Sequence, residues 1–363
     1  MPKMLGKGEW NSTVLNDTER YSNSITLPEF PYKDGRYDRE YVLDLLSSEM
    51  YGYVDANGVT YSVEQIEINE LQYAGKATHK VFKFKFEKSG KTAEFPVNLF
   101  VPAKKEDCPL IVEINFLREI PNKYTPIEEL MDEGVAIAHV MYEDITSDNN
   151  DFENGLAALL CDRSNSKSAG KISVWAYAAI KIGEFMLNSA LVKAGKLFVA
   201  GHSRLGKTAL WAGAQSEIFA GVLSNCSGCA GAAIFREKQG ENIKKITDVF
   251  PFWFCKNFFK YADKEEELPF DQHFLQALIA PRKLCVVTAQ LDDWADTDAQ
   301  HLAIQLASEV YEKQGVMGLK NGGLLKYGEF DEGGNLNFSK RFGTHFFSRD
   351  DWKFFIRNIK KER

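Results

Sequence analysis

Apolar and polar residues alternate along residues 63–101. The clearest run is residues 81–86, VFKFKF, and a second follows at 93–101, with the turn sequence KSGK at 88–91 between them. A period of two places successive side chains on opposite faces of a strand. This region is therefore predicted to form antiparallel strands joined by a hairpin.

Further along, short apolar runs lack this alternation and are separated by stretches with helical spacing. This pattern is typical of parallel strands buried on both faces. The predicted strands are 108–115, 134–141, 196–200, 221–225 and 283–289. The predicted helices are 41–46, 126–133, 174–187, 298–314 and 352–357, with another that begins at Lys207. The sequence predicts an α/β fold, with a mostly parallel central sheet, helices on both faces and an N-terminal antiparallel hairpin region.

No repeat, low-complexity linker or clear boundary divides the 363 residues, so we expect a single domain. Residues 1–40 are polar with scattered prolines and are expected to lie over the body as a strap. Residues 235–270 are polar and aromatic, and we expect them to form an excursion of the chain near the active site.

Charge and cysteine usage narrow the possible partners. A net charge of −7 argues against nucleic acid or an anionic membrane as the main partner. No apolar run reaches the roughly 18–20 residues of a membrane span, and the N-terminal stretch lacks the apolar segment of a signal peptide. Cys226 and Cys229 have the spacing of metal ligands, but no second pair accompanies them. Buried thiols are therefore expected rather than a metal site.

Residues 196–208, KLFVAGHSRLGKT, combine a short apolar strand, a glycine-flanked turn and the start of a helix. Two chemistries use such a stretch. Gly201 to Thr208 matches G-x-x-x-x-G-K-[ST], the phosphate-binding loop of nucleotide hydrolases. The same residues are similar to the G-x-S-x-G turn that exposes a nucleophilic serine above a sheet. Ser203 would be that serine, although the second glycine, Gly206, comes one residue late.

The other strands distinguish these two hypotheses. A phosphate-binding loop needs a second strand that ends in Asp to position magnesium. The candidate strands instead end at Asn115, Tyr142 and Gln290. This observation argues against nucleotide hydrolysis.

A serine hydrolase of this kind needs an acid after a later strand and then a histidine. Asp292 and Asp293 directly follow the strand 283–289, and His345 precedes the last helix. The order Ser, Asp, His therefore favours a serine hydrolase.

The remaining histidines are weaker candidates for the general base. His202 is expected to point away from the neighbouring nucleophile, and His273 precedes the acid, which is the wrong order. His139 has the position of a core residue within a strand. The other two are His79, in the hairpin, and His301, which follows the acid closely.

The stretch 201–207 resembles the G-x-S-R-x-G-K signature of the glucuronoyl esterases, including their bacterial, acetyl xylan esterase-like members. The resemblance extends roughly over residues 109–352, through blocks at 227–233, 251–255, 268–273, 280–282 and 292–296. It implies an α/β-hydrolase fold without a cofactor. It also implies cleavage of the ester that joins glucuronic acid on xylan to lignin alcohols.

The resemblance further implies the roles of individual residues. Ser203 would be the nucleophile and His345 the general base. Arg204 would offer its backbone N–H and its guanidinium to the oxyanion. The residues that match sugar-contacting positions are Lys207, Glu241 and Trp294.

The acid departs from the pattern of many family members. Their glutamate lies 23 residues after the serine, where this chain has Cys226, and a thiol cannot stabilise an imidazolium as a carboxylate does. Some bacterial members carry an Asp two residues before the tryptophan, which corresponds to Asp292 here. This favours Asp292 over Asp293 as the acid, and both stay open.

The leaving alcohol stays open, and so does the substrate within this class. The expected partner is a glucuronoxylan or lignin–carbohydrate ester, acted on by a monomer. The resemblance implies a secreted or periplasmic location, although no signal peptide is visible. The alternatives are an acetyl xylan esterase, a phosphate-loop nucleotide hydrolase and an inactive carbohydrate-binding relative.

Overall fold

The computed structural model describes residues 25–360 apart from 104–106, 190, 194 and 324. Most of the expected N-terminal strap therefore lies outside the described residues. No helix in the described part of the chain is long and apolar enough to cross a membrane.

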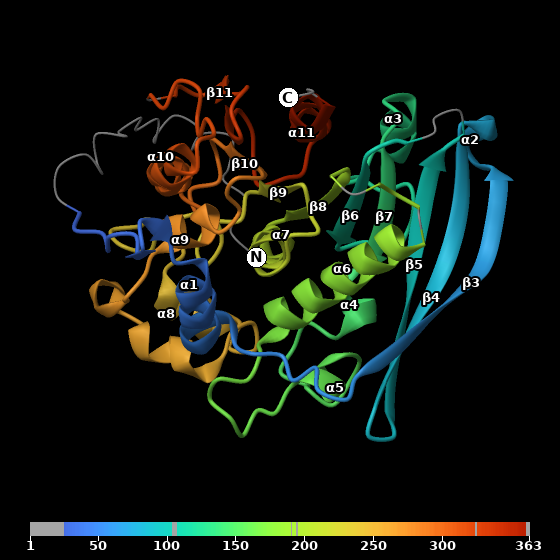
Figure 1. The fold of residues 1–363 in the computed structure, drawn as a ribbon, viewed down its shortest axis with the longest axis horizontal. Coiled ribbons are helices and arrows are strands. Elements are labelled where there is room, and N and C mark those ends of the chain that lie inside the picture. Colours follow the sequence, from blue (N-terminus) through green and yellow to red (C-terminus); the bar gives the residue numbers. More distant parts are fainter. Residues whose placement is uncertain (1–24, 104–106, 190, 194, 324, 361–363) are drawn as a thin grey trace, which may run out of the picture.

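A ten-stranded mixed sheet runs through the molecule (Figure 1). From one edge to the other its strands are β11 (Glu329–Asp331), β12 (Leu336–Arg341), β10 (Lys283–Ala289), β9 (Gly221–Asn225), β8 (Leu197–His202), β6 (Leu110–Asn115), β7 (Ala136–Met141), β5 (Lys91–Pro102), β4 (Ala77–Lys88) and β3 (Thr60–Leu71). The strands from β12 to β7 are parallel. β3, β4 and β5 form an antiparallel extension that joins the sheet through β7, and β11 pairs antiparallel with β12. A separate pair joins β1 (Tyr32–Lys33) and β2 (Arg36–Tyr37).

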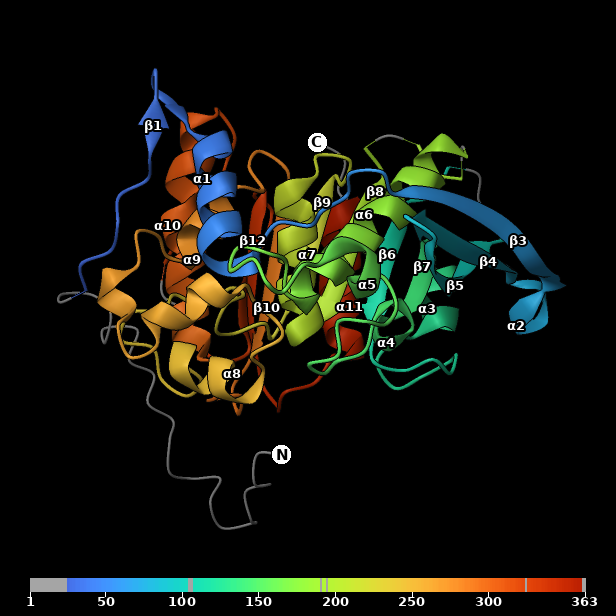
Figure 2. The same cartoon turned by 90° about the horizontal axis from the view of Figure 1, so that it is seen from below.

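Helices cover both faces of the parallel strands. The α-helices of the described residues are α1 (Arg39–Leu46), α2 (Gln72–Gly75), α3 (Ile127–Asp132), α4 (Tyr142–Ile145), α5 (Ala157–Leu160), α6 (Lys171–Asn188), α7 (Arg204–Gln215), α8 (Ile243–Val249), α9 (Gln272–Ala277), α10 (Thr297–Lys313) and α11 (Arg349–Lys360). There is also a short π-helix, η2 (Ser47–Tyr51), and there are two short 3-10 helices, η3 (Lys256–Tyr261) and η4 (Glu265–Glu267). Figure 1 shows α6 and α7 on one face and α3 and α11 on the other. In Figures 1 and 2, α1, α8, α9 and α10 gather at the end of the sheet opposite β3.

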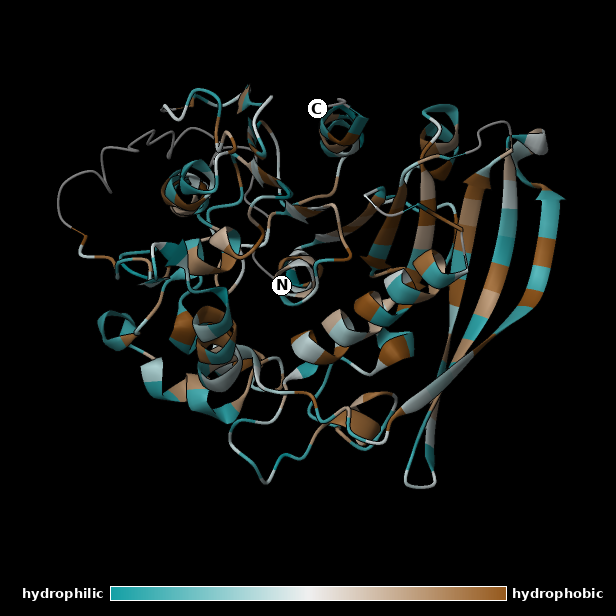
Figure 3. Cartoon of the chain, viewed as in Figure 1, coloured by the Kyte–Doolittle hydropathy of each residue, from teal (hydrophilic) through white to brown (hydrophobic). Residues whose placement is uncertain are grey.

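The sheet separates two hydrophobic cores because successive strand residues point to opposite faces. Leu110 and Val199 belong to the core shared with α6, α7 and α10. Their neighbours Ile111 and Phe198 belong to the core shared with α3 and α11. The central strands are accordingly apolar along most of their length (Figure 3). This explains why their sequences lack the alternation of the N-terminal hairpin.

The observed elements confirm the predicted α/β architecture and the hairpin region, with two corrections. α7 begins at Arg204, and not at Lys207, because the turn at Ser203 leads directly into the helix. The glycine-rich stretch after α10 contains β11 and β12, which the sequence pattern did not predict. β12 carries polar residues at positions such as Asn337, Ser339 and Lys340, so it lacks the apolar run that marks the other parallel strands.

Candidate active site

Ser203 occupies a strained turn between β8 and α7. Its backbone has φ 58° and ψ −125°, a conformation that is costly for a residue with a side chain. A hydrogen bond from its N–H to the Asn225 carbonyl, at 2.8 Å, ties the turn to the end of β9. Gly201 is required because a Cβ there would lie 2.0 Å from the Leu205 carbonyl oxygen. This is the geometry of a nucleophile elbow.

The late second glycine also has a structural reason. A Cβ on Gly206 would lie 3.0 Å from the Asn225 carbonyl oxygen and 3.1 Å from the Cβ of Ser227. Gly206 therefore allows the first turn of α7 to pack closely against the segment that follows β9. The G-x-S-x-x-G spacing reflects this contact.

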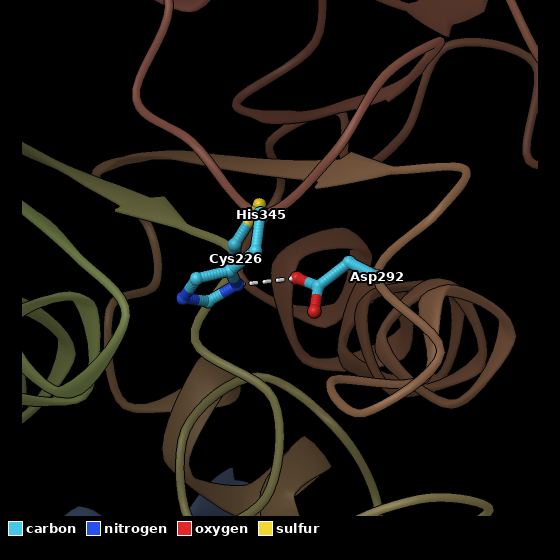
Figure 4. A group of neighbouring side chains, drawn as sticks. All are labelled: Cys226, Asp292 and His345. Atoms are coloured by element: carbon cyan, nitrogen blue, oxygen red, sulfur yellow. Dashed lines mark hydrogen bonds and ion pairs between the residues drawn. The ribbon is translucent and has the colours of Figure 1, made fainter. Parts of the chain in front are cut away.

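His345 and Asp292 are joined by a hydrogen bond of 2.7 Å between Nδ1 and Oδ2 (Figure 4). Asp292 lies just beyond β10 and is buried, whereas His345 lies between β12 and α11 with 42% of its side chain exposed. The neighbouring Asp293 is exposed. Of the two adjacent carboxylates, the structure brings Asp292 to the imidazole.

His202 lies against His345 and also contacts Asn225, the residue that holds the Ser203 turn. Its ring centroid lies 4.5 Å from that of His345, and its Nδ1 is 2.6 Å from Oδ1 of Asn225. Burial, followed by the charge of His345, holds the pKa of His202 well below its usual value, so this ring is neutral. The described residues show no hydrogen bond between Ser203 and His345. In enzymes without bound substrate, catalytic hydrogen bonds are often long and tighten only with substrate present.

The guanidinium of Arg204 is held by a carboxylate and by aromatic rings. Asp148 forms an ion pair with its Nη1 and also accepts a 2.7 Å hydrogen bond from Nε1 of Trp253. The guanidinium carbon lies 4.6 Å from the Trp253 ring centroid and 5.1 Å from that of Phe250. Nε of Arg204 is buried, and no group among the described residues accepts a hydrogen bond from it. Nε is therefore a buried donor that no group among the described residues uses.

Lys207, Glu241 and Trp294, the three expected sugar-contacting residues, lie together. Nζ of Lys207 donates to the Ser227 carbonyl at 2.6 Å and lies 3.8 Å from a carboxylate oxygen of Glu241. The other carboxylate oxygen of Glu241 accepts from Nε1 of Trp294 at 3.1 Å. Burial lowers the pKa of Lys207, and the charge of Glu241 opposes this shift. Trp294 is 47% exposed, so a flat apolar surface faces solvent beside a buried cation.

Cys226 lies beside the acid and the histidine. It follows β9 directly, has φ 47° and is 1% exposed. Burial, followed by the charge of Asp292, raises the pKa of its thiol well above the usual value. The side chain is therefore a neutral thiol that contacts the carboxylate and cannot take the carboxylate's place.

Sequence reasoning missed two residues at this site. Asp148 lies in the loop-rich stretch after β7, where no motif distinguishes it from its polar neighbours. Trp253 falls within the excursion 235–270, in a block that shares the family resemblance but carries no predicted role. Both became evident only from their contacts with Arg204. The available signal in the sequence was Arg204, because a charged residue beside the nucleophile needs an oppositely charged partner when it is buried.

The parallel sheet, the elbow after β8, and the acid and histidine that follow β10 and β12 form the arrangement of the α/β hydrolases. The family model described as "Glucuronyl esterase, fungi" matches residues 84–315, which is more than half of the chain. The chain belongs to this glucuronyl esterase family.

Individual relatives agree with this assignment. A carbohydrate esterase from an unknown prokaryotic organism is 37% identical over 236 residues, which is 63% of this chain and 54% of that protein. The 4-O-methyl-glucuronoyl methylesterase of Podospora anserina is 29% identical over 57% of this chain and 44% of its own length. The chain thus spans about half the length of these curated relatives.

Solved structures match over nearly the full length. The glucuronoyl esterase from Solibacter usitatus superposes with a TM-score of 0.84 at 28% identity, covering 93% of this chain and 98% of that one. A promiscuous CE15 esterase from a marine bacterial metagenome gives a TM-score of 0.80 at 28% identity, covering 95% and 98%. The α/β-hydrolase fold is therefore shared with these esterases.

Proposed function

We propose that this protein is a serine esterase that hydrolyses the ester between a glucuronic acid substituent of xylan and an alcohol. The observation that carries the proposal is the 2.7 Å pair of His345 and Asp292 beside a strained Ser203 elbow. Family membership supports the substrate class. The proposal places the enzyme outside the cytoplasm, where plant cell-wall polysaccharide is found.

Ser203 attacks the ester carbonyl and His345 takes its proton. A serine hydroxyl is a weak nucleophile until an adjacent base accepts the proton during attack. Asp292 holds Nδ1 of the imidazole protonated, so that Nε2 is the basic nitrogen, and it stabilises the imidazolium that forms. His345 then returns the proton to the leaving alcohol. Water repeats the sequence on the acyl-enzyme to release the glucuronate.

Arg204 stabilises the oxyanion of both tetrahedral intermediates. Its backbone N–H follows the nucleophile, where the α/β hydrolases place an oxyanion donor. Its guanidinium, which is paired with Asp148 and lies over the Trp253 ring, supplies a second, charge-assisted donor. A single donor of this kind contributes about 2.7–4 kcal/mol to the transition state. Asp148 offsets part of the guanidinium charge, and the same ion pair fixes the position of the guanidinium.

Lys207, Glu241 and Trp294 form the sugar-binding side of the site. The Trp294 ring offers an apolar face, and the Lys207 ammonium and Glu241 carboxylate offer a donor and an acceptor for sugar hydroxyls. The placement of Lys207 also argues against nucleotide hydrolysis. Its Nζ contacts the Ser227 carbonyl and lies near Glu241, whereas a phosphate-loop lysine reaches the phosphates.

The test compares turnover of benzyl glucuronate, 4-nitrophenyl acetate and ATP by the same preparation. The proposal predicts that kcat/KM for benzyl glucuronate is the highest and that ATP is neither hydrolysed nor bound at micromolar concentration. Preference for the acetate would support an acetyl esterase instead. Binding of glucuronoxylan without any turnover would identify an inactive carbohydrate-binding relative.

The variant Thr208→Ala distinguishes a phosphate-binding loop from a nucleophile elbow. In a phosphate loop this hydroxyl binds magnesium. Here its Oγ1 bonds to the Arg204 carbonyl at 3.0 Å within α7. We expect the variant to retain esterase activity within about threefold, since one neutral hydrogen bond contributes only about 0.5–1.5 kcal/mol to stability.

A further inference from the structure

Three metal-ligating side chains meet beside the elbow. Sγ of Cys226, a carboxylate oxygen of Asp292 and a ring nitrogen of His345 lie within 4.8 Å of one another (Figure 4). Thiolate, imidazole and carboxylate are the ligand types that zinc prefers in proteins. The catalytic proposal uses Asp292 and His345 but gives the thiol no task.

The three residues follow neighbouring strands of the parallel sheet. Cys226 follows β9, Asp292 lies just beyond β10, and His345 lies beyond β12, and these three strands are parallel neighbours. Their side chains therefore converge at one edge of the sheet, from the ends of adjacent strands.

We propose that Cys226, Asp292 and His345 form an inhibitory binding site for a thiophilic divalent cation such as Zn²⁺. The inhibition rests on the proposed esterase function, whereas the binding does not. The metal would occupy the place of the proton between His345 and Asp292, with the thiolate as its third ligand. A water molecule or the substrate would complete a tetrahedral site.

Zinc binding requires only small changes in the distances between the three ligand atoms. With Zn–N and Zn–O near 2.1 Å and Zn–S near 2.3 Å, tetrahedral ligand atoms are separated by roughly 3.3–3.6 Å. The Nδ1–Oδ2 separation of 2.7 Å must open, and the largest separation in the group, at most 4.8 Å, must close. His345 is 42% exposed and is the member most able to adjust, whereas Cys226 and Asp292 are buried.

Binding changes the protonation of two groups. The Cys226 thiol loses its proton to solvent as the metal–sulfur bond forms. The imidazole proton moves from Nδ1 to Nε2, through solvent, so that the Nδ1 lone pair can bind the metal. One proton is thus released for each cation bound. The Nε2–H that results cannot accept the proton of Ser203, and this explains the inhibition.

Zinc affinity should rise with pH, because the metal competes with a proton for the thiol. Magnesium should not bind, since it demands near-octahedral oxygen ligands and loses water reluctantly. Cys229 provides a matched control. It is a buried free thiol three residues away that does not belong to the group of three ligands.

The experiment titrates Zn²⁺, and in parallel Mg²⁺, into the intact enzyme in a buffer that does not bind metals. Isothermal calorimetry reports binding, and benzyl glucuronate turnover reports inhibition. We expect one zinc to bind and inhibit, with activity restored by EDTA, and no effect of magnesium. Cys226→Ser and Cys226→Ala should each weaken zinc binding at least about tenfold, since even losing a partner of a ligand typically costs 10–100-fold. Cys229→Ala should bind zinc as the wild type does.

Cobalt supplies a readout independent of activity. Co²⁺ bound by Cys226 should give a thiolate-to-cobalt charge-transfer band in the wild type and in Cys229→Ala, and no such band in Cys226→Ser. That pattern in a protein without esterase activity would uphold the metal site and contradict only the proposed function. The inference is overturned if the wild type binds no zinc, or if Cys226→Ser and Cys226→Ala bind zinc as tightly as the wild type. A circular dichroism spectrum of each variant checks that it is folded.

Discussion

Oδ2 of Asp292 lies 2.7 Å from Nδ1 of His345, whereas the adjacent Asp293 is exposed. Asp292→Asn should therefore lower kcat for benzyl glucuronate by at least about 10²-fold, because the amide can hold the wrong imidazole tautomer. Asp293→Asn is the matched control and should change kcat by less than about fivefold. A dead Asp293→Asn beside a near-neutral Asp292→Asn would show that the acid is misassigned.

A carboxylate at position 226 should take over from Asp292. The side-chain ligand atoms of Cys226, Asp292 and His345 lie within 4.8 Å of one another, so a glutamate at 226 can reach the same imidazole. Cys226→Glu in the Asp292→Asn background should recover part of the lost kcat. Cys226→Gln in that background has the same size without the charge and should recover nothing. Equal recovery by both would mean that packing, and not charge, was restored.

Asp148 is a positioning residue for the Arg204 guanidinium. Removing one partner of a charged hydrogen bond costs about 1.5–3 kcal/mol, so Asp148→Asn should lower kcat by about 10- to 100-fold. KM should change little, because the oxyanion exists only after attack. Asp144→Asn is the control, since Asp144 pairs with the exposed Arg118 in the same region. A rise in KM at unchanged kcat would instead assign Asp148 to substrate binding.

His301 should make stability depend on pH. It is 1% exposed, and both of its ring nitrogens lack partners among the described residues. Burial, followed by the charge of Lys340, lowers its pKa to about 4. The pKa of a histidine in the unfolded chain is near 6.5. At a pH between these two pKa values, the unfolded chain therefore binds the proton more readily than the folded chain does. The contribution of the neutral His301 to the free energy of unfolding is therefore fully present above about pH 6.5, and it is lost as the pH falls toward 4.

His301→Gln removes this titration and should flatten the loss of unfolding free energy from pH 6.5 to 4. The difference should be about 2–3 kcal/mol, at roughly 1.4 kcal/mol per pKa unit. Denaturant unfolding at several pH values measures it. Only the slopes are compared, so a uniform loss of stability in the variant does not affect the result. Equal slopes would show that His301 does not titrate as described.

Local sequence patterns predicted most of the fold. The alternation in residues 63–101 became β3, β4 and β5, and the apolar runs became parallel strands, because burial on one or both faces leaves its period in the sequence. β12 was not predicted because its sequence, LNFSKR, carries polar residues at four of its six positions. The strands β6 and β8, LIVEIN and LFVAGH, are equally short but consist mostly of apolar residues.

The candidate site likewise contains residues that the sequence predicts and others that it does not. Ser203 and Asp292 are predicted from the sequence because each follows a predicted strand, and His345 because it comes later in the chain, which gives the order Ser, Asp, His of the α/β hydrolases. The choice between Asp292 and Asp293 rested on the family pattern, and the structure supplies the matching contact. Asp148 could not be predicted, since its partner Arg204 is 56 residues away and only the fold brings them together.

The most direct measurement is the rate of benzyl glucuronate hydrolysis by the wild type and by Ser203→Ala at equal concentration. Removing the nucleophile leaves only the contribution of binding and oxyanion donors. We expect efficient turnover by the wild type and loss of all but a trace of it in the variant, with an unchanged circular dichroism spectrum. Turnover by Ser203→Ala at more than a few per cent of the wild-type rate would contradict the assignment of Ser203 as the nucleophile.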